Sequence, residues 1–419
     1  MSGQTEIIKK QAVIIGGGPA GLAAAAGLYR EGVRDILILE REHEPGGILR
    51  QCIHDGFGLM RFGESLSGPE YAARFLDQIK ELGISYEIDT TVTALSKDRI
   101  VTAASRRGLR QYQADAVILA MGCRERTRGA LSIPGERPAG VFTAGVAQTY
   151  INLKNTMVGK TAVILGSGDI GMIMARRLTL EGAKVIGVFE IKPYAAGLAR
   201  NIEQCLNDYD IPLSLSHTVT DIKGRSRLTS VTVSEVDENM RPIPGTEREY
   251  PCDTLILSVG LIPENELSRG AGIALDARTK GAKVDEFCQT SIPGIFAAGN
   301  VLQVHDLVDY VSLEAERLAK SAARMLREGA LPKAEIPVLP GEGVGYVVPQ
   351  RISGTEDALL SLRVQKPQKP LKLTVEQDGK VICSLSKKKA EPAVLLQLKL
   401  PKEKLLSQNP IKVVAHDEA

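Results

Sequence analysis

Two segments of the chain repeat the same order of apolar and polar positions. Apolar runs at residues 12–15 and 162–165 each lead into a glycine cluster, and a stretch with apolar residues at helical spacing follows each cluster. A second apolar run closes each copy, at 36–39 and 185–189. The order strand, turn, helix, strand is typical of α/β units with parallel sheets, so the chain is predicted to contain two such units.

Other periodic segments extend the two predicted units. Helical spacing predicts a helix at residues 70–82, and β-like segments reach about residue 113. Two continuous apolar runs that end in small residues predict buried strands, one in each unit, at 116–122 and 255–260. In the second unit the pattern further predicts a crossover at 139–151, a helix at 200–208 and an alternating β-strand at 228–236.

After residue 263 the chain is expected to return to the first unit. A short strand there ends before Gly299, and an amphipathic helix rich in strong helix formers runs to about Arg327. A Pro/Gly-rich boundary at 331–345 precedes alternating apolar residues, which predict a small all-β module. The expected domains are residues 1–140 with 266–330, an inserted domain at 141–265, and a C-terminal module at 340–419.

Both glycine clusters have the spacing Gly-x-Gly-x-x-Gly. In a strand–turn–helix context, the first glycine permits a tight turn, the second lets the backbone approach a pyrophosphate, and the third brings the helix against the strand. The helix N-terminus offers unpaired N–H groups to the phosphate. Glu40 and Glu190 end the second strand of each copy, where a carboxylate accepts hydrogen bonds from a ribose. The sequence thus predicts two dinucleotide sites in one chain.

Composition adds a broad class to this organisation. The chain has 419 residues, 43% hydrophobic and 24% charged residues, and a net charge of +2, as a globular protein without a nucleic-acid partner would. The basic run at 387–389 is interpreted as solvated surface. No apolar run is long enough to span a membrane, and glycines interrupt the first one at once, so we expect a cytoplasmic protein without a signal peptide.

The six cysteines are spread along the chain and form no C-x-x-C or C-x-x-x-x-C pair. This spacing argues against a local redox dithiol or a zinc knuckle, and no metal site is predicted. A disulfide or an iron–sulfur cluster built from distant cysteines stays open, although a reducing compartment disfavours the disulfide. The pattern therefore favours organic cofactors.

The paired glycine motifs, the strand at 116–122 and the segment at 290–300 resemble the two-dinucleotide-binding flavoproteins of the pyridine nucleotide–disulfide reductase superfamily. The resemblance covers roughly residues 10–330. It implies FAD in the first site, NAD(P)H in the second, and a late Gly-Asp pair that contacts the flavin's ribityl and phosphate region. Here the pair is Gly299-Asn300, and an amide can still hydrogen-bond a hydroxyl. A helix beginning near Val311 would point its N-terminus at the pyrimidine edge of the flavin.

The implied contacts with FAD are Gly16, Gly18, Pro19, Ala20, Gly21, Glu40, Arg41, Gly47, Ile48, Leu49, Ala120, Met121, Gly122, Gly299, Asn300 and Val311. The implied contacts with NAD(H) are Gly166, Gly168, Asp169, Ile170, Gly171, Glu190 and Gly260. Glu190 favours NAD over NADP, because a carboxylate repels a 2′-phosphate, whereas the nearby Lys192 argues the other way.

The chain also departs from the disulfide reductases. It lacks their cysteine pair, and Ile173 stands where many members have a glutamate that positions a lysine near the flavin. Cys52 and His54 are the candidate catalytic residues, as a proton relay or as modulators of the flavin potential. The simpler interpretation is a buried small residue and a packed histidine, and His305 is expected to be structural.

A closer resemblance is to the FAD/NAD-linked subunits of multicomponent dehydrogenases, among them those of FAD-dependent glycerol-3-phosphate dehydrogenase, opine oxidase and hydrogen cyanide synthase. The segments 46–58 and 166–178 look most like the glycerol-3-phosphate-associated members. This implies a second flavoprotein dehydrogenase as partner and, in some cases, a small cysteine-containing subunit. The C-terminal module is expected to contact the partner, with a lid or a homodimer element as the alternative. Two other functions stay open: a stand-alone NADH oxidase or diaphorase, and a scaffold whose nicotinamide site is silent.

Overall fold

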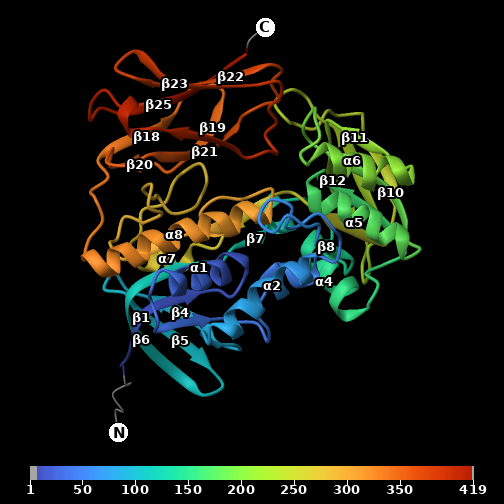
Figure 1. Cartoon of the computed structure of the whole chain (residues 1–419). Coiled ribbons are helices and arrows are strands. Elements are labelled where there is room, and N and C mark those ends of the chain that lie inside the picture. The colour runs from blue at the N-terminus through green and yellow to red at the C-terminus, as the bar shows by residue number, and fades with distance from the viewer. Residues whose placement is uncertain (1–6, 418–419) are drawn as a thin grey trace. The chain divides into compact units, whose positions relative to one another are not determined.

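The computed structural model describes residues 7–417 and divides the chain into two compact units. The first unit runs up to Cys123 and resumes at Pro263, and the second comprises Arg124–Ile262 (Figure 1). The second unit is therefore an insertion in the first. Two short strands, β7 (Cys123–Glu125) and β16 (Leu261–Pro263), lie where the chain passes between them.

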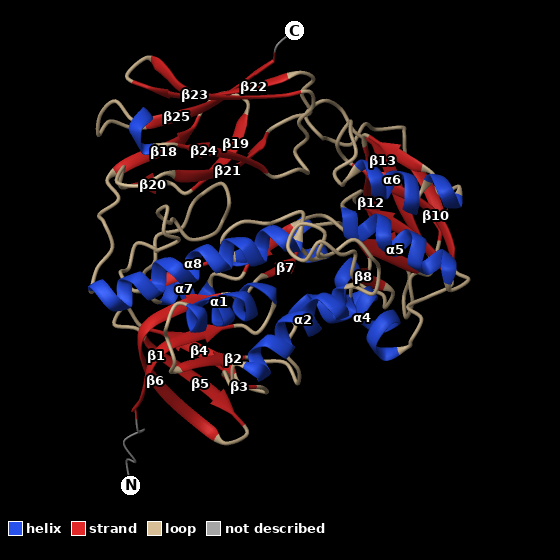
Figure 2. Ribbon diagram, in the orientation of Figure 1, coloured by secondary structure: helices blue, strands red, loops and turns tan. Residues whose placement is uncertain are grey.

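A seven-stranded sheet lies in the first unit, in the order β3-β2-β1-β6-β5-β4 with β17 beside β6. Strands β1 to β6 of this sheet are labelled in Figure 2. Strands β1, β2, β3, β6 and β17 are parallel, and β4 and β5 add an antiparallel edge. The strands are β1 (Ile7–Ile15), β2 (Ile36–Leu39), β3 (Ser85–Glu87), β4 (Thr91–Leu95), β5 (Ile100–Ser105), β6 (Gly108–Leu119) and β17 (Ile295–Ala297).

Helices of the first unit pack closely because small residues line their contacts. They are α1 (Pro19–Arg30), α2 (Gly68–Glu81), α7 (Glu266–Gly270) and α8 (Val308–Glu328). A Cβ at Gly27 of α1 would lie only 2.7 Å from the Cβ of Ala319 in α8, so glycine permits this crossing. Helix α2 begins with a capping box between Ser67 and Glu70. Its Tyr71 and Phe75 are fully buried in the core that α1, α2 and α8 share.

The second unit contains a five-stranded parallel sheet in the order β11-β10-β9-β15-β8 and an antiparallel sheet β12-β13-β14. Its strands are β8 (Val141–Thr143), β9 (Thr161–Leu165), β10 (Lys184–Glu190), β11 (Leu213–Leu215), β12 (His217–Lys223), β13 (Ser230–Glu235), β14 (Arg248–Pro251) and β15 (Thr254–Leu257). Its helices are α3 (Arg128–Leu131), α4 (Ala144–Lys154), α5 (Asp169–Leu180) and α6 (Ala199–Cys205).

The start of the second unit differs from the expected position at residue 141. The segment before it already belongs to this unit, because the Glu136 N–H donates to Ile222 O (2.8 Å) and its carboxylate accepts from Gly224 N (2.5 Å). The expected crossover contains a strand, β8, which pairs in parallel with β15. Three residues are too few to show strand periodicity in a sequence.

The C-terminal module consists of two sheets, β20-β18-β25-β22-β23 and β19-β21-β24, around one apolar core. Its strands are β18 (Ile336–Pro340), β19 (Val344–Val348), β20 (Arg351–Ile352), β21 (Ala358–Val364), β22 (Leu371–Gln377), β23 (Lys380–Lys387), β24 (Leu396–Leu400) and β25 (Ile411–Asp417). The module begins earlier than residue 340, inside the Pro/Gly-rich segment expected as a boundary. Ile336 and Val338 are buried, whereas Pro337 is partly exposed and Leu339 is exposed, so the alternation holds from Ile336 to Leu339 in spite of Pro337.

Within residues 7–417, no helix is long and apolar enough to cross a membrane. The longest, α8, carries charged residues along its length.

Candidate functional site

The first glycine turn connects β1 to α1, and backbone atoms pack directly against two of its glycines. Gly16 has φ +105°, and a Cβ there would lie 2.5 Å from the carbonyl oxygen of Ala120. Gly21 packs against the carbonyl of Gly16 so closely that no side chain fits. Gly18 is the N-cap of α1, and no side chain caps this helix. Its first amides are therefore available to an anion, as a pyrophosphate site requires.

Glu40 lies directly after β2 and is 5% exposed. Its Oε2 accepts a hydrogen bond from Gly17 N (2.8 Å), and its Oε1 accepts one from Glu42 N (2.9 Å). The carboxylate thus reaches the glycine turn, where a ribose would meet it. Arg41 points into solvent and pairs with Glu42 at 3.6 Å.

A second glycine turn faces the first. Gly46 N donates to Gly17 O (2.7 Å), and a Cβ at Gly47 would lie 3.0 Å from the Cα of Gly18. A Cβ at Gly18 would meet only Gly47, at 3.9 Å. The two turns leave a cradle lined by backbone, which fits the pyrophosphate of a dinucleotide such as FAD. Of the two residues that follow, Leu49 is buried and Ile48 is 53% exposed.

The second unit repeats the carboxylate contacts and the glycine packing of the first. Glu190 Oε2 accepts from Ser167 N (2.9 Å) and Ser167 Oγ (2.7 Å), and Glu190 Oε1 accepts from Lys192 N (3.0 Å). Gly166 has φ +97° and packs on the carbonyl of Ser258, as Gly16 packs on Ala120. Gly168 is the uncapped N-cap of α5. The residues fit a second dinucleotide, such as NAD(P)H.

The second site contains residues that the sequence analysis missed. Gly197 approaches the first turn of α5, because a Cβ there would lie 2.9 Å from Asp169 N. Asp169 Oδ1 fastens this segment by accepting from Leu198 N (2.8 Å) and Asn201 Nδ2 (2.6 Å). Ser258 Oγ accepts from Gly171 N (3.0 Å). Gly197 stands at the same distance from its glycine motif as Gly47 does, and this repeat spacing is a signal that could have revealed it.

Three further expected nucleotide residues, Ala120, Gly122 and Gly260, follow the ends of strands. Ala120 N donates to Ile15 O (2.9 Å), which extends the sheet beyond β6, and Gly122 turns the chain with φ +72°. In the second unit Gly260 has φ +105° and accepts a hydrogen bond from Arg126 N (3.0 Å). Met121 is half-buried against the core beneath the sheet of the first unit.

Gly299 joins this region to α8. A Cβ at Gly299 would lie 2.9 Å from the Cβ of Ala20 and 3.1 Å from Val311 Cγ1. Val311 is 6% exposed and packs beneath this glycine within the first unit. Helix α8 begins at Val308, three residues earlier than expected, so Val311 serves the packing of the turn and not the helix N-terminus.

Asn300 belongs to a buried polar network. Its Oδ1 accepts from His305 N (3.0 Å), and its Nδ2 donates to Cys123 Sγ (3.6 Å). His305 Nε2 lies 3.5 Å from Glu314 Oε1, and Glu314 Oε2 accepts from Gly299 N (2.7 Å). Burial opposes ionisation of Glu314, but His305 and the Gly299 amide outweigh it and lower the pKa of this carboxyl. The network fixes both residues of the Gly-Asn pair.

The two candidate catalytic residues have different surroundings. Cys52 is 5% exposed, and its Sγ donates to Ile48 O (3.3 Å). Burial raises the pKa of this thiol to about 12, so it stays protonated near neutral pH. His54 is half-buried and packs on Phe57 with ring centroids 4.9 Å apart. All six cysteines lie among the described residues, and none of them forms a disulfide.

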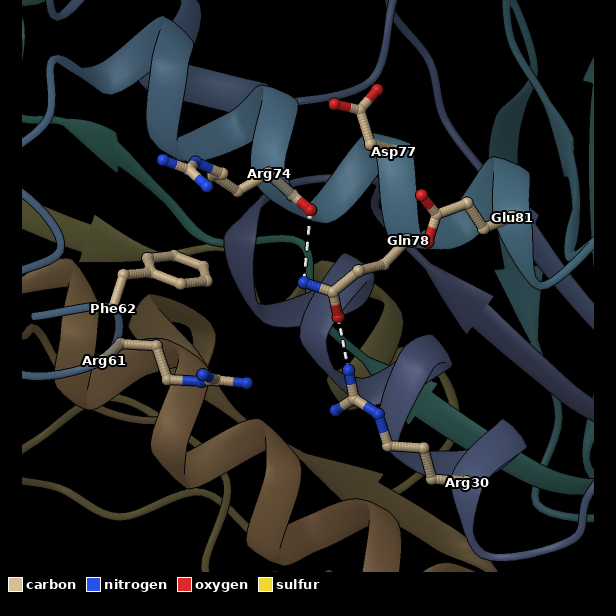
Figure 3. A pocket seen from close by; sticks show the side chains of 7 residues that line it. All are labelled: Arg30, Arg61, Phe62, Arg74, Asp77, Gln78 and Glu81. Atoms are coloured by element: carbon tan, nitrogen blue, oxygen red, sulfur yellow. Dashed lines mark hydrogen bonds between the residues drawn. The ribbon is translucent and has the colours of Figure 1, made fainter. Parts of the chain in front are cut away.

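A separate pocket of about 490 Å³ lies in the first unit between the end of α1, α2 and the loop before α2 (Figure 3). It is lined by Arg30, Arg61, Phe62, Arg74, Asp77, Gln78 and Glu81. Gln78 links two of its arginines, donating to Arg74 O (3.1 Å) and accepting from Arg30. None of the expected nucleotide contacts lines this pocket.

Two Rossmann-like units with matching glycine turns and carboxylates define a class, the two-dinucleotide-binding oxidoreductases. Residues 10–325 match the model of the pyridine nucleotide-disulphide oxidoreductase family, and the chain belongs to this family. Its members are NAD(P)H-linked flavoprotein oxidoreductases that use FAD.

Individual relatives share only about a quarter of their aligned residues with this chain. Hydrogen cyanide synthase subunit HcnB of Pseudomonas aeruginosa is 27% identical over 353 residues, which cover 77% of this chain and 73% of HcnB. An opine oxidase subunit of Agrobacterium tumefaciens is 26% identical, over 69% of this chain and 60% of that protein. The crystal structure of T. acidophilum thioredoxin reductase superposes with a TM-score of 0.61 at 23% identity, covering 75% of this chain and 98% of that one. The last comparison shows the shared fold.

Proposed function

We propose that the chain is the FAD-containing, NAD(H)-linked subunit of a multicomponent dehydrogenase, and that it passes electrons between NAD(H) and a partner flavoprotein. The observation that carries this proposal is the repeated cradle: Glu40 holds the turn at Gly17, and Glu190 holds the turn at Ser167, each through Oε2. Two such cradles suit two dinucleotides. When bound, FAD and NAD(H) supply hydride chemistry, and the protein supplies orientation and shielding.

FAD is assigned to the first unit. Its cradle between Gly18 and Gly47 is lined by backbone, and the Gly299-Asn300 pair is held by Glu314 and His305. An Asn side chain both donates and accepts, so Asn300 can bind a ribityl hydroxyl or a phosphate-linked oxygen in place of the usual aspartate. We expect the contacts named from the sequence to surround the cofactor there.

NAD is favoured over NADP in the second unit. Both oxygens of Glu190 accept backbone hydrogen bonds, so this side chain is fixed at the end of β10. A fixed carboxylate there repels a 2′-phosphate and accepts a ribose hydroxyl. Lys192 does not reach the carboxylate through its ammonium, which lies 5.5 Å from the ring centroid of Tyr194.

The partner assignment draws on the relatives and on the chemistry of the cysteines. HcnB and the opine oxidase relative are both named as subunits of larger enzymes. The chain lacks a dithiol motif, and Cys52 is a buried thiol with a raised pKa, so electrons that reach the flavin need an acceptor other than a cysteine pair. A second flavoprotein meets this need, and the resemblance in segments 46–58 and 166–178 favours one that oxidises glycerol 3-phosphate.

Purification of the native protein from its host tests the proposal. We expect a second flavoprotein to co-elute in size exclusion, and NADH to bleach the bound flavin under anaerobic conditions. Bleaching by a chain that elutes alone would favour the stand-alone NADH oxidase or diaphorase. Bound FAD that NADH does not bleach would overturn the proposed electron transfer and leave a scaffold protein.

A further inference from the structure

The C-terminal module forms hydrogen bonds and an ion pair with the loop that leads from the Gly299-Asn300 pair into α8. Arg363 lies on β21 of this module. Its Nη2 donates to Val304 O (3.0 Å) and lies 3.5 Å from Asp306 Oδ1. The other oxygen of Asp306 accepts from Leu395 N (3.3 Å), a second residue of the module. Both oxygens of this carboxylate therefore meet the C-terminal module.

The guanidinium of Arg363 is fixed from its own side as well. Its Nε donates to Tyr346 OH (3.2 Å) and its Nη1 to Pro392 O (2.9 Å). Planar guanidinium donors held by several acceptors lose little freedom when they bind a further group. The Arg363 side chain is 16% exposed. It is a rigid anchor and not a flexible surface cation.

Asp306 depends on this anchor. Its side chain is 4% exposed, and among residues 7–417 its Oδ1 receives no hydrogen bond. The charge of Arg363 is what compensates the burial of that oxygen, because a buried carboxylate without a partner is strongly unfavourable. Removal of Arg363 should therefore displace Asp306 and the loop that carries it.

The neighbour of Asp306 connects the loop to the cofactor region. His305 N donates to Asn300 Oδ1 (3.0 Å), and His305 Nε2 lies 3.5 Å from Glu314, which holds Gly299 N. Asp306 follows His305 directly, and the His305 N–H orients the Asn300 side chain. A shift of Asp306 would therefore also move this N–H. Helix α8 begins two residues after Asp306, so the same shift moves its first turn.

We propose that Arg363 is a positioning residue for the flavin: through Val304 and Asp306 it holds Asn300 and the start of α8 in the geometry that FAD requires. The inference rests on the proposed FAD site in the first unit. It gives the C-terminal module a role in cofactor binding, whether or not the module also contacts a partner.

The test compares Arg363→Gln with Arg278→Gln. Arg278 also links the module to the rest of the first unit, because its Nη1 donates to Val344 O (3.1 Å) and Gly345 O (2.7 Å). These hydrogen bonds do not involve the described loop at 303–307. FAD affinity is measured by titrating apoprotein with FAD and following flavin fluorescence. The orientation and surroundings of the bound flavin ring are monitored by visible circular dichroism. We expect Arg363→Gln to raise the Kd of FAD by about tenfold and to change the dichroism, and Arg278→Gln to leave both near wild type.

Equal FAD affinity and dichroism in Arg363→Gln and wild type would overturn the inference, as would equal losses in both variants. If Arg363→Gln does not fold, Asp306→Asn removes the same ion pair without leaving an unpaired buried carboxylate, and it is judged by the same two measurements. A wild-type protein that binds no FAD would instead refute the proposed function.

Discussion

Glu190 holds the turn at Ser167 with the same carboxylate oxygen that Glu40 uses to hold the turn at Gly17. Each glutamate also receives the amide two residues further on, from Lys192 and from Glu42. The same pair of hydrogen bonds therefore occurs at the glycine turn of each Rossmann-like unit. Gly47 lies against the first turn and Gly197 against the second, and the side chain of Asp169 also holds the second of these segments.

The fixed charge of Glu190 should decide between NADH and NADPH. In Glu190→Gln the side chain keeps its size but loses the charge that repels a 2′-phosphate. We expect the ratio of kcat/KM for NADH over NADPH to fall by about tenfold, which corresponds to about 1.4 kcal/mol. Glu40→Gln is the matched control, since it alters the first site only. An unchanged ratio in Glu190→Gln would contradict the assignment.

The close approach of Gly47 to Gly18 should make Gly47 indispensable for FAD. Gly47→Ala introduces a Cβ 3.0 Å from the Cα of Gly18 and keeps φ at +57°. Gly83→Ala is a matched control, because Gly83 has φ +64° and a Cβ there would meet nothing within 4 Å. Both variants bear the left-handed strain of about 1 kcal/mol, whereas only Gly47→Ala should lose FAD during gel filtration. Equal FAD retention would show that the cradle does not need this glycine.

Cys52 should be dispensable for flavin reduction. Its thiol has a pKa raised to about 12 by burial, so it does not supply a thiolate near neutral pH. We expect Cys52→Ala to be reduced by NADH at a rate within about twofold of wild type, since the substitution removes only a small buried group. Stopped-flow absorbance of the flavin measures this rate. A loss of two orders of magnitude with retained FAD would restore Cys52 as a catalytic residue.

Asp285 should make the stability of the first unit depend on pH. Burial raises its pKa to about 7, although the amides of Gln289 and Phe287 partly counter this. The folded state thus holds a proton that the unfolded state releases at lower pH. The contribution of this bound proton to the free energy of unfolding is complete below the ordinary pKa of 3.8 and is lost as pH rises through about 7.

Asp285→Asn keeps an acceptor for the Phe287 and Gln289 amides and removes the titration. We therefore expect the stability of wild type to fall relative to the variant as pH rises from about 4 to about 7, by at most about 1.4 kcal/mol per pH unit. Urea unfolding at several pH values measures the difference. A constant difference across this range would mean that Asp285 titrates normally.

The sequence by itself determined the two Rossmann-like units and the places of their glycine turns. Apolar runs, glycine spacing and terminal carboxylates are local features, and each needs only its own segment to be recognised. The same logic identified α2 and α8 within a few residues of their ends. It failed for β8 and β18, because a three-residue strand has no measurable period and because prolines within a short strand resemble a linker.

Only the tertiary structure decided which distant residues meet. Glu314 reaches Gly299, Ser258 reaches Gly171, and Arg363 reaches Asp306, and no local pattern in the chain marks these pairs. A hydrogen bond or an ion pair between separate segments depends on the packing of the elements that carry them. For the same reason the burial of Cys52, which sets the chemistry of its thiol, follows from the fold and not from its neighbours in sequence.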